Sequence, residues 1–205
     1  MTFPPDFTRP DKKARVAEIA AKVIATLAPD RRVVVQAGGC AGLWPLALAN
    51  HFAEVYAFEP EPTNFECLCK NAREHSAGNI WAYDRALGDA SRRVGLTRPK
   101  AKAGLWRVDG DGDTQMVSLD DFFSAIPVLD ALVLDVEGHE VQAWKGAETL
   151  IAKFRPLLWF EGIHNTDAIN EFLKSHGYGQ PIVGMNHDYF SVHETRKAHQ
   201  EGVYA

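Results

Sequence analysis

The chain has few cysteines, and their spacing supports neither a disulfide framework nor a zinc site. Three cysteines occur among 205 residues, an odd and sparse number that does not describe a set of disulfides. Cys67 and Cys69 lie two positions apart, but the sequence offers no second pair of ligands to complete a tetrahedral zinc site. We therefore expect reduced thiols.

Long apolar runs are also missing. No stretch approaches the ~20 apolar residues of a membrane-spanning helix. The N-terminal segment MTFPPDFTRPDKK has no apolar region of the kind found in a signal peptide. These absences predict a soluble, cytoplasmic protein with no membrane partner.

The charge balance lacks the positive excess of many nucleic-acid-binding proteins. The formal net charge is −5, from 27 acidic and 22 basic residues, and a negative chain repels polyanions at long range. Nucleic acid is therefore not the expected partner. The dense basic segment at 92–107 is interpreted as a solvated loop.

Length and composition predict one folded domain. A chain of 205 residues is close to the usual size of a domain, and 46% hydrophobic residues are enough for a sizeable core. We expect a single domain over 1–205, with an N-terminal helical segment at 1–29 and a surface insertion at 88–117.

Helices and strands alternate along the first half of the chain. The helix predicted at 63–75 is expected to begin at a capping box formed by Thr63 and Glu66. An alternation of strand and helix is typical of a doubly wound parallel α/β sheet with helices on both faces. The pattern predicts helices at 11–27, 43–52 and 63–75, and strands at 33–35, 55–58 and 80–83.

The alternation resumes after the insertion. The insertion itself is charged and glycine-rich, and short antiparallel strands are expected near 93–96 and 115–117. The predicted elements that follow are a short helix capped by Ser118, a strand at 129–134, a helix at 140–154 that breaks near Gly146, a strand at 157–160, a helix from Asn165 to Gly177, and two strands within 178–192 around a turn at 184–187.

Two features at consecutive strand ends predict a nucleoside-binding site. The segment Gln36-Ala37-Gly38-Gly39-Cys40-Ala41-Gly42 follows the first strand, and glycines let a backbone approach a ligand closely. Glu59 ends the second strand, 21 residues after Gly38, where a carboxylate accepts hydrogen bonds from ribose hydroxyls. Asp84, at the end of the third strand, is placed to accept a hydrogen bond from an adenine amino group.

Acidic and histidine side chains also follow the next two predicted strands. They are Asp135, Glu137 and His139 after one strand, and Glu161 and His164 after the other. Charged groups at the end of an apolar strand are costly unless they bind something or are solvated. Ligands of open α/β sheets bind outside the carboxyl ends of the strands, so we expect these residues to face the same crevice as the glycine turn.

Together these segments resemble the FkbM family of class I methyltransferases. The family's hallmarks are matched by AFEPEPTNFECLCKN at 57–71, RALGD at 85–89 and LDVEGHEVQAWKGAETLIAKFRPLLWFE at 134–161. The resemblance covers about residues 30–165. It implies a Rossmann-like, doubly wound sheet of seven mostly parallel strands with an antiparallel terminal hairpin. It also implies S-adenosylmethionine as methyl donor and a hydroxyl of a sugar, glycan or small metabolite as acceptor.

The chemistry of methyl transfer suggests roles for the strand-end residues. One catalytic residue is expected to remove the acceptor's proton: His164, because histidine titrates near neutral pH, or Glu137 or Glu161 if burial raises the pKa of either. Alternatively, a magnesium ion held by Asp135, Glu137 and Glu161 orients a diol. The expected catalytic residues are Glu137, His139, Glu161 and His164, and the expected donor-binding residues are Gln36, Gly38, Gly39, Cys40, Gly42, Glu59, Pro60, Asp84, Arg85, Ala86 and Asp135.

Two other functions stay open. Gln36 and Cys40 stand where the family commonly has Asp and Asn, so the chain is alternatively a donor-binding homologue that no longer catalyses. A nicotinamide-dependent oxidoreductase is disfavoured, because the glycines do not follow G-x-G-x-x-G and the sequence has no Tyr-x-x-x-Lys pair. The absence of the N-P-P-Y signature argues against N-methylation of adenine or glutamine.

Overall fold

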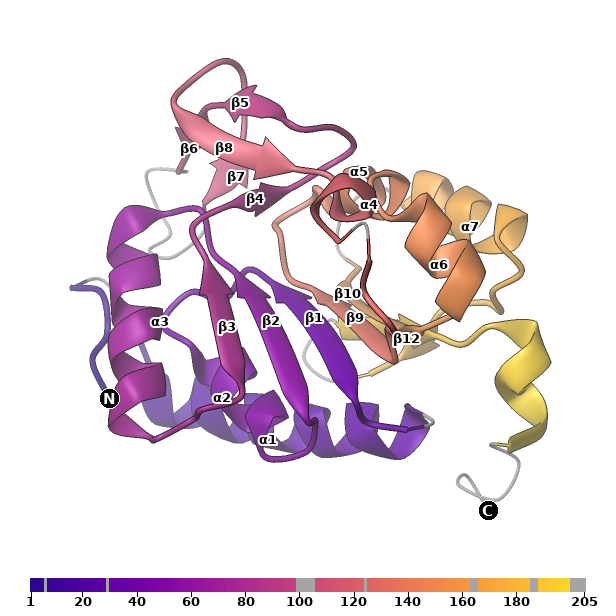
Figure 1. The fold of residues 1–205 in the computed structure, drawn as a ribbon, viewed down its shortest axis with the longest axis horizontal. Coiled ribbons are helices and arrows are strands. Elements are labelled where there is room, and N and C mark those ends of the chain that lie inside the picture. The colour runs from indigo at the N-terminus through magenta and orange to yellow at the C-terminus, as the bar shows by residue number, and fades with distance from the viewer. Residues whose placement is uncertain are drawn as a thin grey trace.

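A seven-stranded sheet forms the centre of the structure. The structure is a computed structural model, and it describes residues 1–5, 7–28, 30–98, 106–123, 125–162, 166–184 and 188–199. The strands lie in the order β11-β12-β10-β9-β1-β2-β3 (Figure 1). Strands β1, β2, β3, β9 and β10 are mutually parallel, whereas β12 is antiparallel to both of its neighbours. This confirms the predicted Rossmann-like sheet with an antiparallel terminal hairpin. The bounds are β1 Val33–Ala37, β2 Glu54–Phe58, β3 Ile80–Tyr83, β9 Ala131–Leu134, β10 Leu157–Glu161, β11 Ile182–Val183 and β12 Asp188–Ser191.

Helices cover both faces of this sheet, because the buried strands are apolar on both sides. Along β1, Val34 packs with α1 and α2, whereas Val33 and Val35 pack with the cluster that includes α5, α6 and α7 (Figure 1). None of the described helices is both long and apolar enough to cross a membrane. The helices are α1 Pro10–Leu27, α2 Leu43–Ala49, α3 Pro62–Glu74, α4 Leu119–Phe122, α5 Glu140–Lys145, α6 Glu148–Phe154, α7 Thr166–Ser175 and the 3₁₀ helix η1 Glu194–His199.

The helix cap at Ser118 and the break at Gly146 agree with the sequence prediction, whereas α2 ends at Ala49 rather than near 52 and α3 begins differently. Ser118 caps α4, since its side chain accepts a hydrogen bond from the N–H of Asp121, and Gly146 separates α5 from α6. The capping box at Thr63 is wrong. Glu61 caps α3 instead, and its carboxylate accepts from the N–H of Asn64 at 2.7 Å. Pro62 explains the difference, because proline is favoured in the first turn of a helix. The predicted cap at residue 165 lies outside the described residues.

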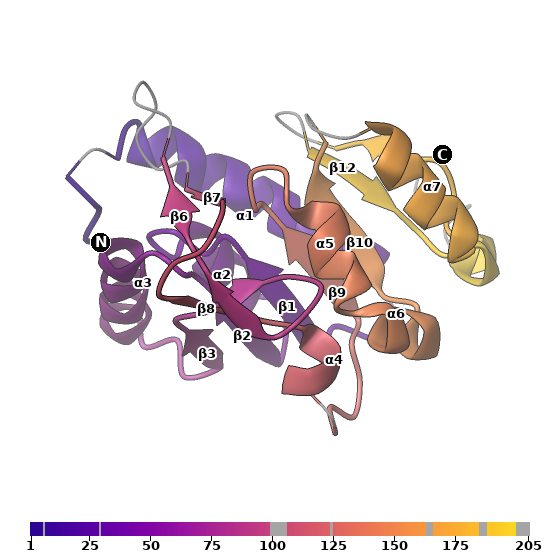
Figure 2. The same ribbon diagram turned by 90° about the horizontal axis from the view of Figure 1, so that it is seen from above.

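The inserted segment forms two small sheets over the carboxyl ends of the central strands (Figures 1 and 2). The predicted antiparallel pair is confirmed, since β5 pairs with β8. A second antiparallel pair, between β6 and β7, was not predicted. The strands are β4 Ala86–Leu87, β5 Arg92–Val94, β6 Leu96–Thr97, β7 Arg107–Val108 and β8 Thr114–Val117.

The core beside β10 supplies a stability test. Trp144 is 0% exposed, and its ring lies 4.9 Å from that of Phe160 and 5.2 Å from that of Phe172. Trp144→Ala is expected to lower the free energy of unfolding by ~3–5 kcal/mol, measured by urea denaturation. The control is Trp81→Ala, which removes a side chain that is 52% exposed and should cost about 1 kcal/mol or less. Equal losses in the two variants would contradict the assignment of the core.

Candidate active site

The carboxyl ends of the parallel strands are level, and this brings the predicted site residues together. The last residues of β1, β2 and β9 are register partners, so the residues that follow them, Gly38, Glu59 and Asp135, lie side by side. Glu161, at the end of β10, follows a residue that is paired with the last residue of β9. The row of strand ends is therefore the edge at which α/β sheets bind ligands.

A cavity of about 290 Å³ opens at this edge. Its size is near the lower end of the ~300–1,000 Å³ typical of small-molecule sites. Most of the predicted site residues contribute to its wall. They are Gly38, Gly39, Cys40, Glu59, Pro60, Arg85, Ala86, Asp135, Glu137, His139 and Glu161.

Three predicted donor-binding residues are not part of the cavity wall. Gln36 is 0% exposed within β1, and its Nε2 donates to the carbonyl of the next residue. Gly42, with φ +89°, precedes α2 and packs against Leu68. Asp84 is mostly exposed and is paired with the guanidinium of Arg85. The predicted catalytic residue at 164 lies outside the described residues.

Hydrogen bonds within the protein hold the glycine turn in shape. The N–H groups of Gly38 and Gly39 both donate to the carbonyl oxygen of Phe58, at 3.0 and 3.1 Å. Gly38 has φ +81°, and a Cβ atom there would lie 1.8 Å from the carbonyl oxygen of Asp135. Only glycine permits this approach. The turn thus lies directly against the end of β9 and presents a backbone surface to the cavity.

Glu59 is a buried carboxyl group that links the glycine turn to α3. It is 4% exposed and accepts hydrogen bonds from the N–H of Cys40 at 2.7 Å, the N–H of Glu61 at 2.8 Å and Nδ2 of Asn64 at 3.4 Å. Burial outweighs these bonds and raises the pKa of Glu59 to about 7. A carboxylate has about four lone-pair sites, so a further donor can still bind.

The environment of Cys40 does not activate its thiol as a nucleophile. Burial, together with the charge of Glu59, raises the pKa of its thiol to about 12, so the thiol stays protonated. Its φ of 44° is a left-handed backbone conformation that few residues adopt. Its main contribution to the site is therefore the backbone N–H that binds Glu59.

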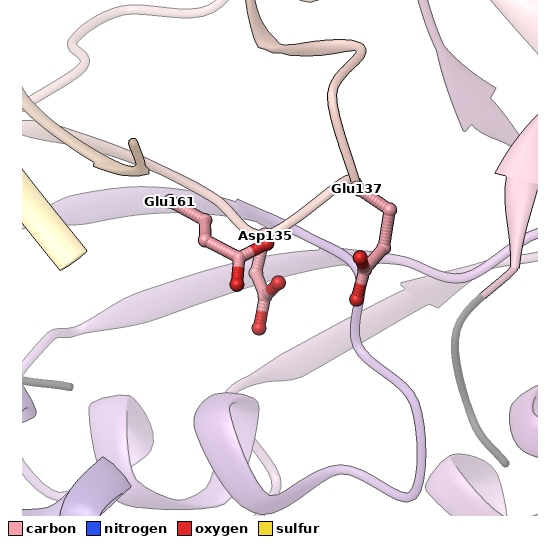
Figure 3. Close-up of side chains that lie close together, drawn as sticks. All are labelled: Asp135, Glu137 and Glu161. Carbon is pink, nitrogen blue, oxygen red and sulfur yellow. The ribbon is translucent and has the colours of Figure 1, made fainter. Parts of the chain in front are cut away.

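Three carboxyl groups converge on the other side of the cavity. Figure 3 shows Asp135, Glu137 and Glu161 reaching into the same space, and one ligand oxygen of each lies within 4.8 Å of the others. Burial, and then the charges of Glu161 and Glu137, raise the pKa of Asp135 well above its usual value. Asp188, the register partner of Glu161 on β12, also lines the cavity, and burial raises its pKa to about 7.

The loop after β9 is fixed by a buried acid. Glu140 is 2% exposed, and its Oε1 accepts from the N–H groups of Val136 and Gly138, both at 3.3 Å. Glu137 between them has φ 56°. The loop therefore holds Glu137 in a strained conformation that directs it to the cavity.

His139 ends this loop. Among the residues that the structure describes, it is the histidine that lines the cavity. Its Nε2 is buried and has no hydrogen-bond partner among the described residues. Burial lowers the pKa of His139 below its usual value. The ring is therefore neutral at neutral pH and has the protonation state that a base requires.

Residues outside the parallel strands form a wall that the sequence did not predict. They lack a motif, because their positions depend on how separate segments pack rather than on local spacing. Asp188 was also missed, since it lies on β12, the reversed strand that comes last along the chain. The unpredicted residues include Phe7, Lys13, Val16, Trp44, Leu96, Trp106, Val108 and Asp188.

The fold is shared with a structurally characterised methyltransferase of the FkbM type. Residues 42–179 match the Methyltransferase FkbM domain, which covers more than half of the chain. The protein belongs to the FkbM methyltransferase family, as the motifs at 57–71 and 134–161 predicted.

Individual relatives agree with this family. The chain is 29% identical over 99 residues to hexuronic acid methyltransferase AglP of Haloferax volcanii, a match that covers 46% of this chain and 41% of that protein. The crystal structure of methyltransferase FkbM from Methylobacillus flagellatus KT has a TM-score of 0.60 at 19% identity, and the match covers 78% of this chain and 44% of that chain. The chain thus spans less than half the length of these two relatives.

A shorter protein shares the fold over nearly its whole length. The structure of a putative methyltransferase from Streptococcus mutans, in complex with SAH, has a TM-score of 0.53 at 10% identity. That match covers 90% of this chain and 97% of the other. At this identity the likeness concerns the fold alone.

Substitution of glycine tests the geometry of the turn. Gly38→Ala is expected to lower the free energy of unfolding by roughly 2–5 kcal/mol, because it adds both left-handed strain and a backbone clash. Gly110→Ala, at φ +63° with no atom within 4 Å of the added carbon, should cost only the strain, ~1–2 kcal/mol. Gly78→Ala, which also meets no atom within 4 Å, should cost little. Thermal and urea unfolding would measure the stability losses of the three variants. A Gly38→Ala variant as stable as the Gly78→Ala variant would contradict the expected order of these losses.

Proposed function

We propose that the protein is an S-adenosylmethionine-dependent methyltransferase that methylates a hydroxyl group of a sugar or small metabolite. The observation that carries the proposal is the cavity in which the glycine turn and buried Glu59 meet the carboxyl groups of Asp135 and Glu161. Membership of the FkbM family supports methyl transfer. The bound SAH of a structural relative supports the donor.

The residues present suit the donor's nucleoside. Gly38 and Gly39 present backbone without side chains to the cavity, which leaves room for a ligand. Glu59 faces the same space with acceptor capacity to spare, and such a carboxylate binds ribose hydroxyls. Arg85 and Ala86 line the next strand end, where the adenine would lie.

The chain's own residues would align and deprotonate the acceptor. When bound, S-adenosylmethionine supplies an electrophilic methyl group. The acceptor oxygen must be held in line with this group, and its proton must be removed. His139 is neutral, and it faces the cavity together with Glu137. We propose one of these two as the base within the described residues, with the histidine at 164 as a further candidate.

The composition of the cavity supports a polyhydroxylated acceptor. Carboxylate oxygens accept hydrogen bonds from hydroxyl groups, and the aromatic residues Trp44 and Trp106 also line the cavity. The relative from Haloferax volcanii is named for hexuronic acid, a sugar derivative. We therefore place sugars first among the acceptors.

The alternatives are distinguished by ligand binding. Calorimetric titration with S-adenosylmethionine, S-adenosylhomocysteine and NAD separates the three functions. Binding of the first two without NAD supports the proposal, whereas binding of NAD alone favours an oxidoreductase. Donor binding without turnover on any hydroxylated acceptor favours a homologue that has lost catalysis, and Gln36→Asp, which restores the family's acid, would then be tested for recovery.

The raised pKa of Glu59 predicts how donor affinity depends on pH. The group is protonated below a pKa of about 7, and ribose hydroxyls donate best to the charged form. Affinity for S-adenosylhomocysteine is therefore expected to increase between about pH 6 and about pH 8. Glu59→Gln should remove this increase and weaken binding about tenfold at the upper pH.

Comparing the pH dependence of binding in wild type and in Glu59→Gln separates the effect of Glu59 from that of other acids. Asp188, whose pKa is also raised to about 7, is unchanged in the variant, so the difference between the two pH curves reports Glu59. Identical curves for wild type and variant would exclude Glu59 from donor binding.

The base is tested by rate once an acceptor has been identified with radiolabelled donor. His139→Ala or Glu137→Gln is expected to lower the methylation rate about 100-fold or more if the residue is the base, with donor affinity nearly unchanged. If a chelator abolishes turnover and magnesium restores it, the oxygens of Asp135, Glu137 and Glu161 hold a metal instead. Wild-type rates in all of these variants would place the chemistry elsewhere.

A further inference from the structure

Strand β3 lies at one edge of the central sheet and carries an exposed tryptophan. The strand order ends with β3 on one side and with β11 on the other (Figure 1). Proteins usually protect such edges with charged residues or proline, because the outward backbone groups of an edge strand pair readily with another strand. The sequence of β3, Ile-Trp-Ala-Tyr, contains neither a charge nor a proline, and Trp81 is 52% exposed.

The sheet face around Trp81 is aromatic and only partly covered. Side chains alternate along a strand, so Trp81 lies on the same face as Tyr83, whose ring stacks with that of Tyr56 at 6.4 Å between centroids. Among its described residues, the connection from β3 to β9 contributes only the four-residue α4 as helix, because other parts of it form the small sheets over the strand ends (Figure 1). Exposed aromatic residues of this kind are typical of protein interfaces.

The backbone of β3 can pair with a second copy of itself. The carbonyl oxygens of Asn79 and Tyr83 accept hydrogen bonds from the β2 side, at 2.9 and 3.0 Å. Alternate residues of a parallel ladder bond to the same neighbour, so the backbone groups of Ile80 and Ala82 point outward. The N–H of Ile80 makes a long bond of 3.4 Å to the preceding turn, which a partner's carbonyl would replace. In an antiparallel pair, Ile80 of one copy bonds to Ala82 of the other, and Trp81 lies opposite its own copy.

Helix α3 borders this edge with two opposite charges. Glu66 and Arg73 are exposed and lie two turns apart on one face of the helix, with Cys69 between them. Asp84 directly follows β3, and its charge and that of Arg73 both act on the pKa of the Cys69 thiol. This face of α3 is therefore the one that lies toward the edge of the sheet.

The same two-fold axis places these charges next to their opposites. α3 connects the parallel strands β2 and β3 and therefore runs in the opposite direction. With a rise of ~1.5 Å per helical residue and ~3.3 Å per strand residue, counted from the turn between helix and strand, Cys69 lies about level with Trp81. An axis at Trp81 thus sets α3 antiparallel to its copy, with Glu66 of each helix beside Arg73 of the other.

We propose that two copies of the protein associate through β3 and α3, so that their sheets join into one across a two-fold axis at Trp81. The occupant of this edge is a second copy because the backbone pattern, the tryptophan and the two charges on α3 complement themselves about one axis, as an isologous interface requires. The axis is perpendicular to the sheet, so the two cavities face opposite directions and are not covered by the contact.

Analytical ultracentrifugation over a range of protein concentrations measures the association. Wild type is expected to sediment as a dimer at high micromolar concentration and to dissociate on dilution. Trp81→Lys puts a charge on the edge and should raise the dissociation constant about tenfold or more. The matched control is Val183→Lys on β11 at the opposite edge, where the side chain is 71% exposed, and it should leave the association unchanged.

Charge reversal tests whether the interface complements itself. Glu66→Arg or Arg73→Glu alone is expected to weaken the dimer about threefold, because each creates two contacts between like charges. The double variant that carries both substitutions should regain wild-type association, since the pairs form again with reversed sign.

Cross-linking in a Cys69→Ser background tests the register. Trp81→Cys should form a disulfide between two copies under mild oxidation, because directly opposite residues of a non-hydrogen-bonded pair have Cα atoms ~4.5 Å apart. Tyr83→Cys, on the same face but away from the axis, should not.

A wild type that is monomeric at every concentration overturns the proposal and leaves the edge to solvent or to a different protein. A dimer that Trp81→Lys does not weaken, or that Val183→Lys weakens as much, is joined elsewhere and overturns it too. Thermal unfolding below the dissociation constant checks that each variant is folded, and the charge-reversal variants carry the test if Trp81→Lys is not.

Discussion

The level ends of the parallel strands are the constraint on which the site depends. Ala37 is the register partner of both Phe58 and Leu134, so the chain leaves β1, β2 and β9 at the same height. The glycine turn, Glu59 and Asp135 then become neighbours although they are far apart in sequence. A shift of one residue in any of these pairings would turn the strand's side chains to opposite faces and disperse the row. The buried apolar residues that fix the register therefore also fix the site.

The acids that this row brings together are held at a cost to stability. Glu59 and Asp188 have pKa values of about 7 because they are buried, well above the values near 4 of an unfolded chain. The folded state therefore retains protons that the unfolded state releases. By linkage, the contribution of these two groups to stability is fully present below about pH 4 and is lost as the pH rises through about 7. At neutral pH, burial of these two carboxyl groups beside the cavity therefore lowers the free energy of unfolding.

Local signals in the sequence were enough for the strands, most helix ends and the acids that follow the strands. Those features depend on periodicity and on one or two neighbouring residues. The wall formed by Trp44 and Trp106 depends on how α2 and the β6–β7 pair pack over the sheet, and no local pattern encodes that packing. Asp84 illustrates the same limit. Its position at a strand end was predicted correctly, but its side chain pairs with Arg85 and is not part of the cavity wall, which depends on side-chain geometry.

The reversed strand has a consequence for how the molecule is assembled. β12 lies between β10 and β11, yet it is made after both of them. A chain that emerges from the ribosome N-terminus first can pair β1, β2, β3, β9 and β10 before residue 188 exists, whereas β11 has to wait for its partner in the sheet. The glycine turn and Glu59 are thus in place early, and the acidic side of the cavity is completed only when Asp188 pairs beside Glu161.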